Sequence, residues 1–141
     1  QEATKEKQKT GKAIKTFNKS SKKLFILSVT IFTPLYFLIP MIFEFVFGAN
    51  WKIAGEYGQI ILPFVAIQFI AAGLSSTTVI FEMQKLALAW QIGLLFISLT
   101  IILLANLYGL TFDAFLKIYT LFMTLYYALL FFIIKRISKG I

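Results

Sequence analysis

The sequence contains no cysteine and no histidine, and only 6 of its 141 residues are acidic. It can therefore form neither a disulfide nor a zinc site built from cysteine and histidine. Acid–base catalysis needs clustered carboxylates or histidine. The acids beyond the N-terminal segment are instead far apart along the chain: Glu44, Glu56, Glu82 and Asp113. We expect no enzymatic activity, no metal site and no cofactor.

Charged residues are also scarce, at 14% of the chain, against roughly 25% in soluble domains. Apolar residues make up 59% and aromatic residues 17%. The apolar residues form four long stretches, at positions 24–47, 59–81, 86–108 and 112–134. A helix needs about 20 apolar residues to cross the roughly 30 Å hydrocarbon core of a bilayer. The sequence therefore predicts an all-α integral membrane protein with four antiparallel transmembrane helices.

Basic residues are distributed unevenly around these stretches. Eight of the 14 precede the first stretch: Lys5, Lys7, Lys9, Lys12, Lys15, Lys19, Lys22 and Lys23. If this tail is cytoplasmic, twelve basic residues lie on that side, and only Lys52 and Lys117 lie on or near the other. This positive-inside asymmetry places both termini in the cytoplasm. We expect a basic juxtamembrane segment over 1–23, with one or two helical turns, followed by a transmembrane region over 24–139. Nucleic acid is not an expected partner, since no aromatic residues alternate with the lysines to stack on bases.

The connections between the stretches are short. We expect a loop over 48–58 and tight turns over 82–85 and 109–111. Short loops make neighbouring helices antiparallel, which predicts a four-helix bundle or one face of a larger assembly. Pro34 and Pro40 fall inside the first stretch and predict helix kinks, whereas Pro63 falls near the start of the second.

Polar and small side chains recur at helical intervals within the stretches. Two interpretations stay open: close packing between helices, or the lining of a wet translocation cavity. The cavity interpretation names these candidates: Gln68, Ser75, Thr78, Gln91, Ser98, Lys117, Thr120 and Thr124. Gln68, Gln91 and Lys117 favour the cavity, because they are costly to bury. Lys117 follows Asp113 by four residues, so it can form an ion pair with it or engage an anionic lipid-linked substrate.

One segment resembles a known family. Phe47-Gly48, Trp51, Ala54-Gly55, Tyr57, Ile61-Leu62-Pro63 and Glu82-Met83-Gln84 resemble the C-terminal region of Wzx-type polysaccharide flippases. These O-antigen flippases belong to the multidrug/oligosaccharidyl-lipid/polysaccharide exporter superfamily. The resemblance extends over about residues 11–139, and the motif is moderately specific.

The resemblance implies a transporter of twelve to fourteen helices, of which this chain would be a fragment. Such a flippase moves undecaprenyl-diphosphate-linked oligosaccharide across the bacterial inner membrane by alternating access, for surface polysaccharide such as lipopolysaccharide. Its partners would be the lipid-linked oligosaccharide, membrane lipids and the remaining transmembrane helices. Two alternatives stay open. One is a small four-span polyprenyl-linked sugar translocase of the GtrA type, which matches in length and number of spans. The other is a non-transporting membrane assembly subunit.

Overall fold

The computed structural model of the chain describes residues 2–11, 13–75 and 84–139. Its elements are α1 (Glu2–Thr10), α2 (Ile14–Phe47), the 3-10 turn η1 (Ala49–Trp51), α3 (Lys52–Leu74), α5 (Gln84–Leu107) and α6 (Phe112–Ser138). The described residues contain no strand. The four long helices, α2, α3 with η1, α5 and α6, are each long and apolar enough to cross a membrane. The predicted all-α class with four membrane-spanning helices is confirmed.

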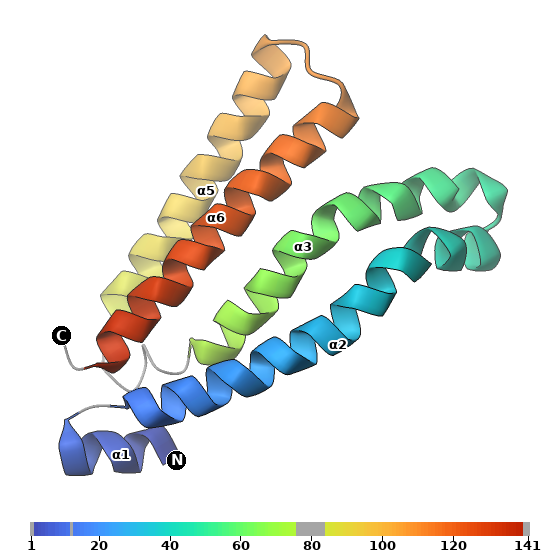
Figure 1. Cartoon of the computed structure of the whole chain (residues 1–141). Helices are drawn as coiled ribbons and strands as arrows, with labels where there is room; N and C mark the ends of the chain where they lie inside the picture. Colours follow the sequence, from blue (N-terminus) through green and yellow to red (C-terminus); the bar gives the residue numbers. More distant parts are fainter. Residues whose placement is uncertain (1, 12, 76–83, 140–141) are drawn as a thin grey trace.

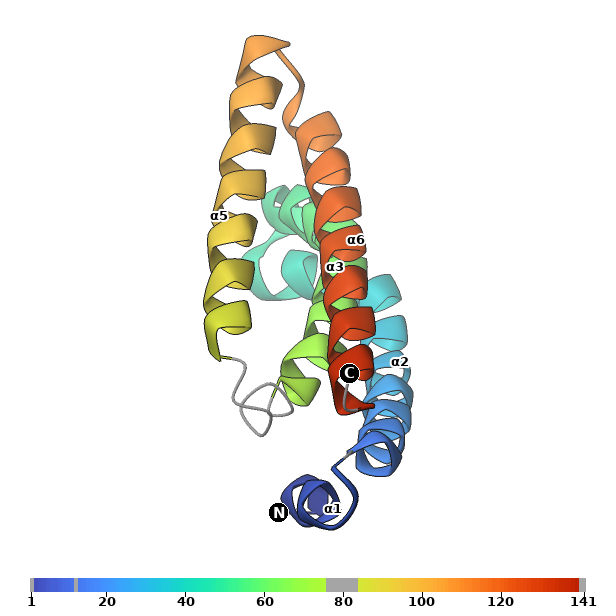
Figure 2. The ribbon, with the colours of Figure 1, turned by 90° about the vertical axis from the view of Figure 1, so that its left-hand side faces the viewer.

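The long helices form two antiparallel hairpins, α2 with α3 and α5 with α6 (Figure 1). Helix α3 is central, because it packs extensively against both α2 and α6, whereas α5 makes fewer contacts, mainly with α6. Figure 2 shows α5 and α2 at opposite edges of the assembly. The two hairpins lie together near the chain termini and diverge toward the other end (Figure 1).

Both termini lie at one end of the bundle, which we call the termini side. The backbone N–H of Ala13 donates to the carbonyl of Ser138 over 2.9 Å. Nearby, the buried side chains of Phe17, Leu74 and Ile134 form a cluster that joins α2, α3 and α6. The termini side is therefore the most tightly connected end of the molecule.

Helix α2 begins at Ile14, ten residues before the predicted span. The first residues of α2 stay helical because one face buries Ala13 and Phe17 at 1% and 3% exposure, while the basic side chains occupy the other face. At about 1.5 Å per residue, 34 residues extend roughly 51 Å, well beyond the hydrocarbon core. Position 24, the predicted start of the span, is where the sequence changes from polar to apolar, and α2 is helical on both sides of it.

A carboxylate from α1 caps this long helix. The Glu6 side chain accepts hydrogen bonds from the backbone N–H groups of Lys15 (3.0 Å) and Thr16 (2.8 Å) and from the Thr16 hydroxyl (2.6 Å). The first N–H groups of a helix lack partners within it, and negative charge is favourable there. The hydrogen bond from the Thr16 side chain is the main reason that the pKa of Glu6 is lowered. Glu6 thus attaches α1 to the start of α2.

The predicted loop over 48–58 is wrong for most of its length. Gly48 ends α2 with a positive φ of 96°, η1 follows, and α3 already begins at Lys52. The second helix therefore starts seven residues earlier than predicted, and Pro63 lies in its interior rather than near its start. Gly55 and Gly58, which fall within the predicted loop, lie inside α3.

The other two predicted connections are the turns at 109–111 and 82–85, and only the first lies wholly within the described residues. The predicted turn at 109–111 agrees with the structure, in which α5 ends at Leu107, Gly109 has a φ of 60°, and α6 begins at Phe112. Of the predicted turn at 82–85, the first two residues lie outside the described residues, and Gln84 and Lys85 are already helical.

Candidate functional site

Polar and aromatic side chains meet where α3, α5 and α6 come together. The Gln68 amide of α3 donates to the Tyr127 hydroxyl of α6 over 3.3 Å. One turn earlier on α3, the ring of Phe64 contacts the Tyr127 ring at 5.6 Å between centroids. Lipid offers no hydrogen bonds, so an amide inside an apolar helix is stabilised by a partner on a neighbouring helix.

Helix α5 joins the same region through Trp90. Its indole stacks on the Tyr126 ring with centroids 3.7 Å apart, and the Tyr126 hydroxyl donates to the Trp90 carbonyl over 2.8 Å. Gly93 makes this approach possible, because a Cβ there would lie 2.5 Å from the Tyr126 hydroxyl. Trp90 also contacts the Tyr127 ring edge-on at 6.5 Å. We call Gln68, Trp90, Tyr126 and Tyr127 the aromatic cluster.

The aromatic cluster contains an unused hydrogen-bond donor. Trp90 is only 9% exposed, and its indole nitrogen has no hydrogen-bond partner among the described residues. Burying a polar group without a partner costs free energy, so an orphaned donor in a native structure calls for an explanation. Tyr127 precedes Lys135 by eight residues, which puts the cluster about 12 Å from the basic end of α6. The cluster therefore lies within the membrane-spanning part, in the half on the termini side.

Some other candidates from the sequence also lie inward. Thr120 lies on a face of α6 that is turned away from solvent and is only 8% exposed. Its hydroxyl has no hydrogen-bond partner among the described residues. Thr124 on α6 and Ser98 on α5 are half-buried. The structure brings Gln68 into the aromatic cluster and gives α6 a partly polar inner face.

The remaining candidates lie elsewhere. Gln91, next to Trp90, is exposed on the surface of α5 and does not join the aromatic cluster. Ser75 is exposed at the end of α3, where its hydroxyl donates to the Ala72 carbonyl over 2.7 Å. Thr78 lies outside the described residues. Pro34 and Pro40 lie inside α2, which curves along its length in Figure 1.

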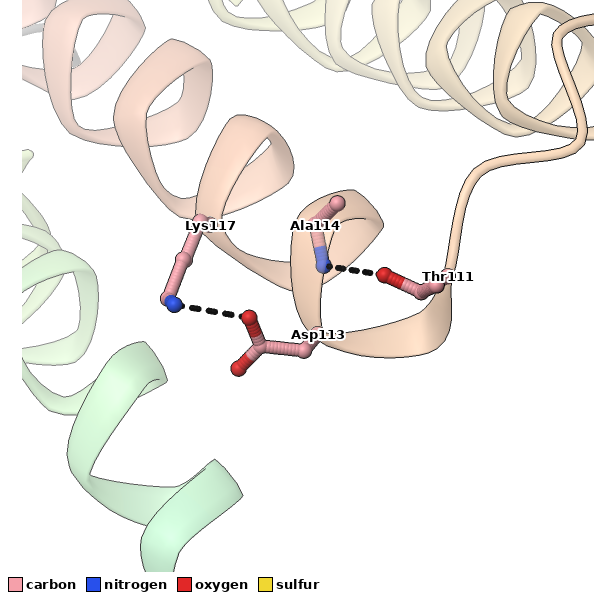
Figure 3. A network of polar contacts seen from close by, with 4 residues as sticks. All are labelled: Thr111, Asp113, Ala114 and Lys117. Carbon is pink, nitrogen blue, oxygen red and sulfur yellow. Dashed lines mark hydrogen bonds and ion pairs between the residues drawn. The ribbon is translucent and has the colours of Figure 1, made fainter.

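Lys117 lies at the opposite end of the bundle, in an ion pair. Its ammonium is 2.7 Å from the Asp113 carboxylate, and both side chains are about half exposed, at 63% and 49% (Figure 3). Asp113 is in the first turn of α6, where negative charge is favourable, and the Thr111 hydroxyl accepts from the Ala114 N–H over 3.4 Å. An exposed pair at this spacing contributes only about 0.3–0.5 kcal/mol, so Lys117 can exchange Asp113 for another anion at low cost.

A second interhelical contact was missed by sequence reasoning. Pro40 has no N–H, so the carbonyl of Tyr36, four residues earlier, loses its normal partner within the helix. The Gln59 amide of α3 donates to that carbonyl over 2.6 Å. Gly55, one turn before Gln59, lies against Pro40 so closely that a Cβ there would be 2.4 Å from the Pro40 Cα. The signal that could have revealed this site is the i, i+4 spacing of Gly55 and Gln59, read as one helix face.

Several small polar side chains are bonded in ways that support packing. The Ser28 hydroxyl of α2 donates to the Ala66 carbonyl of α3 over 3.1 Å. The hydroxyls of Thr30 and Thr100 donate to carbonyls one turn earlier in their own helices. These small polar side chains therefore serve helix geometry and helix contact.

Within the described ranges, no group of three or more Asp, Glu, His or Cys residues could hold a metal ion. The chain matches no family model, no curated protein and no solved structure.

Proposed function

We propose that this chain is part of a membrane transporter that flips undecaprenyl-diphosphate-linked oligosaccharide across the bacterial inner membrane by alternating access. In this proposal both termini are cytoplasmic, and the remaining helices of the transporter complete the cavity. The observation that carries the proposal is the aromatic cluster, with its buried and unpaired Trp90 indole N–H.

The chemistry of the aromatic cluster suits a polyhydroxylated cargo. Gln68 offers an amide donor and acceptor, Tyr127 a hydroxyl, and Trp90 a donor only. A sugar hydroxyl both donates and accepts, so it can replace the 3.3 Å contact between Gln68 and Tyr127 without leaving either group unpaired. Polar groups at membrane depth are expensive and frequently mark a substrate pathway.

The sequence motif and the far-end ion pair add support. The motif around Trp51 and Tyr57 resembles that of the flippases, and Tyr57 packs edge-on against Phe112 at the start of α6, with centroids 4.8 Å apart. Lys117 is one turn and a half along α6 from Phe112. A lysine there can reach out to phosphate groups at the membrane surface, where it would meet the diphosphate of a cargo that has crossed.

The test is a surface-polysaccharide assay in cells that depend on the intact protein. We expect Gln68→Leu to reduce the surface polysaccharide strongly at unchanged abundance of the protein in the membrane. A combined variant with Leu at positions 68, 91 and 117 should abolish it. The matched control is Gln8→Leu, which makes the same change at an exposed position of α1 and should leave the polysaccharide intact.

The assembly subunit is the second candidate, favoured by the hydrogen bonds that Ser28 and Gln59 make directly between α2 and α3. It predicts a different outcome. Full surface polysaccharide in the combined variant would overturn the transport proposal and favour the assembly subunit. Loss caused equally by Gln8→Leu would also overturn it, because the aromatic cluster would then have no special role.

A further inference from the structure

A groove on the termini side runs between α2, α3 and α6, with a volume of about 480 Å³. This volume is within the roughly 300–1,000 Å³ of small-molecule sites. Asn18, Ser21 and Lys22 of α2 and Lys135 of α6 line one part of it. It is separate from the aromatic cluster, and the proposed transport function does not use it.

The polar side chains of the lining lie toward the termini side, with the Phe17 ring beside them, and the lining beyond them toward the membrane centre is apolar. On α2 the polar residues Asn18, Ser21 and Lys22 precede Phe25, and on α6 Lys135 follows Ala128 by seven residues, or about 10 Å. The two helices run in opposite directions, so both lysines lie toward the termini side and both apolar ends lie toward the membrane centre. Ile67, Ile70 and Phe132 extend the apolar part.

Among the described residues, no carboxylate forms an ion pair with the two lysines at the polar end. Lys22 is exposed and Lys135 is half-buried, and neither takes part in the ion pairs found among the described residues, which join Lys52 to Glu44 and Lys117 to Asp113. Glu6 is the carboxylate described on this side, and it already accepts three hydrogen bonds at the start of α2. An anion at this end would therefore meet two lysines and two further side-chain donors.

We propose that this groove binds one anionic phospholipid of the leaflet on the termini side. The phosphate lies between Lys22 and Lys135, with Asn18 and Ser21 as hydrogen-bond donors, and an acyl chain follows Phe25 and the apolar wall inward. The order of the lining matches the order of a phospholipid: charge at the membrane surface and hydrocarbon below it. A membrane helix of another protein with a wholly apolar face would fill the apolar part of the groove but leave both lysines unpaired.

The test measures which lipids stay with the purified intact protein. The protein is reconstituted in nanodiscs of phosphatidylcholine with a minor fraction of phosphatidylglycerol, extracted into mild detergent, and its bound lipid is quantified by mass spectrometry. We expect enrichment of phosphatidylglycerol in the wild type. Lys22→Gln with Lys135→Gln should weaken its retention on the order of thirtyfold, from about fivefold for each lysine. Ala128→Trp, which fills the apolar part and keeps both charges, should displace the lipid as well.

The control variant combines Lys85→Gln with Lys139→Gln, which removes two exposed charges from the same end of the bundle outside the groove. It should retain phosphatidylglycerol like the wild type. An equal loss in both double variants would overturn the proposal, because general surface charge would then explain the binding. Undiminished retention in Ala128→Trp, or no preference for phosphatidylglycerol in the wild type, would overturn it too. None of these outcomes bears on the surface-polysaccharide assay, so the two proposals can fail separately.

Discussion

The close contact between α3 and the proline segment of α2 allows a sharp test with one substitution made at two positions. Gly55→Ala and Gly58→Ala both add a single methyl group to α3, three residues apart. A Cβ at Gly55 would lie 2.4 Å from the Pro40 Cα and 3.0 Å from both the Pro40 nitrogen and the Ile39 carbonyl oxygen. A Cβ at Gly58 would lie 2.9 Å from the terminal Cδ1 of the Ile39 side chain.

The two clashes differ in what can move. Carbon atoms in contact prefer about 3.5–4.0 Å, so at Gly55 the backbones must separate by more than about 1 Å. At Gly58 rotation of the Ile39 side chain relieves the contact. The gain in helix propensity from Gly to Ala, about 1 kcal/mol, applies to both variants and cancels in their comparison. Overpacking against fixed atoms costs about 1–3 kcal/mol. We therefore expect Gly55→Ala to be less stable than Gly58→Ala by that amount.

The measurement is the unfolding free energy of each variant of the intact protein in the same bicelles, with thermal midpoints as a second reading. Gly58→Ala should be close to the wild type, and Gly55→Ala should be clearly lower. Equal stabilities of the two variants would refute the reasoning, since the backbone contact at Pro40 would then not limit the approach of the helices.

Three further predictions follow from contacts at other positions. Gln59→Leu leaves the Tyr36 carbonyl without its donor, and the unfolding free energy should fall by about 0.6–2 kcal/mol, as for other hydrogen bonds between membrane helices. Glu6→Ala removes the cap of α2, so hydrogen exchange at the Thr16 amide should become about fivefold faster, from the ~1 kcal/mol of a helix cap. Because the pKa of Glu6 is lowered, its contribution is fully present above the ordinary value of 4.5 and is lost as the pH falls through the lower folded value. In the wild type the protection factor of the Thr16 amide, which corrects for the pH dependence of intrinsic exchange, should therefore fall by the same factor in acid. Phe17→Ala empties a site that is 3% exposed, and the unfolding free energy should fall by about 3–5 kcal/mol.

Each of these predictions has a matched control. Gln84→Leu changes an exposed glutamine and should leave the unfolding free energy almost unchanged. Glu56→Ala removes a carboxylate at the other end and should not affect exchange at the start of α2. Phe45→Ala truncates a side chain that is 91% exposed and should cost far less than the buried position. If the measured stability or exchange rate of a control changes as much as that of its paired variant, the contact on which that prediction rests does not have the expected effect.

The predicted spans agree with the structure where polarity and helix end coincide. The first stretch and α2 both end at position 47, and the fourth stretch and α6 both begin at 112. Gly48 and Gly109 with positive φ, and Asp113 in the first turn of α6, mark these ends locally. At these two positions the local sequence was therefore enough to predict where the helix ends or begins.

The errors occur where tertiary contacts decide. The lysines before position 24 predicted a separate tail, but burial of Phe17 against Leu74 and Ile134 keeps the helix continuous through them. Gly55 falls within the predicted loop, yet in the structure it is part of α3 and allows close helix packing against Pro40. Glycine is found both in turns and where backbones approach closely. One residue type supports both uses, and only the neighbouring helix distinguishes them.

The sequence by itself determined that four helices cross the membrane, because apolar length sets that outcome residue by residue. It also identified Gln68 as a residue costly to bury. Only the tertiary structure decided that Gln68 meets Tyr127 while Gln91 lies outward, because the rotation of each helix about its axis depends on contacts with its neighbours. Hydrophobicity is nearly uniform around α3 and α5, which carry Gln68 and Gln91, so it specifies the depth of these helices in the membrane but hardly any direction around their axes.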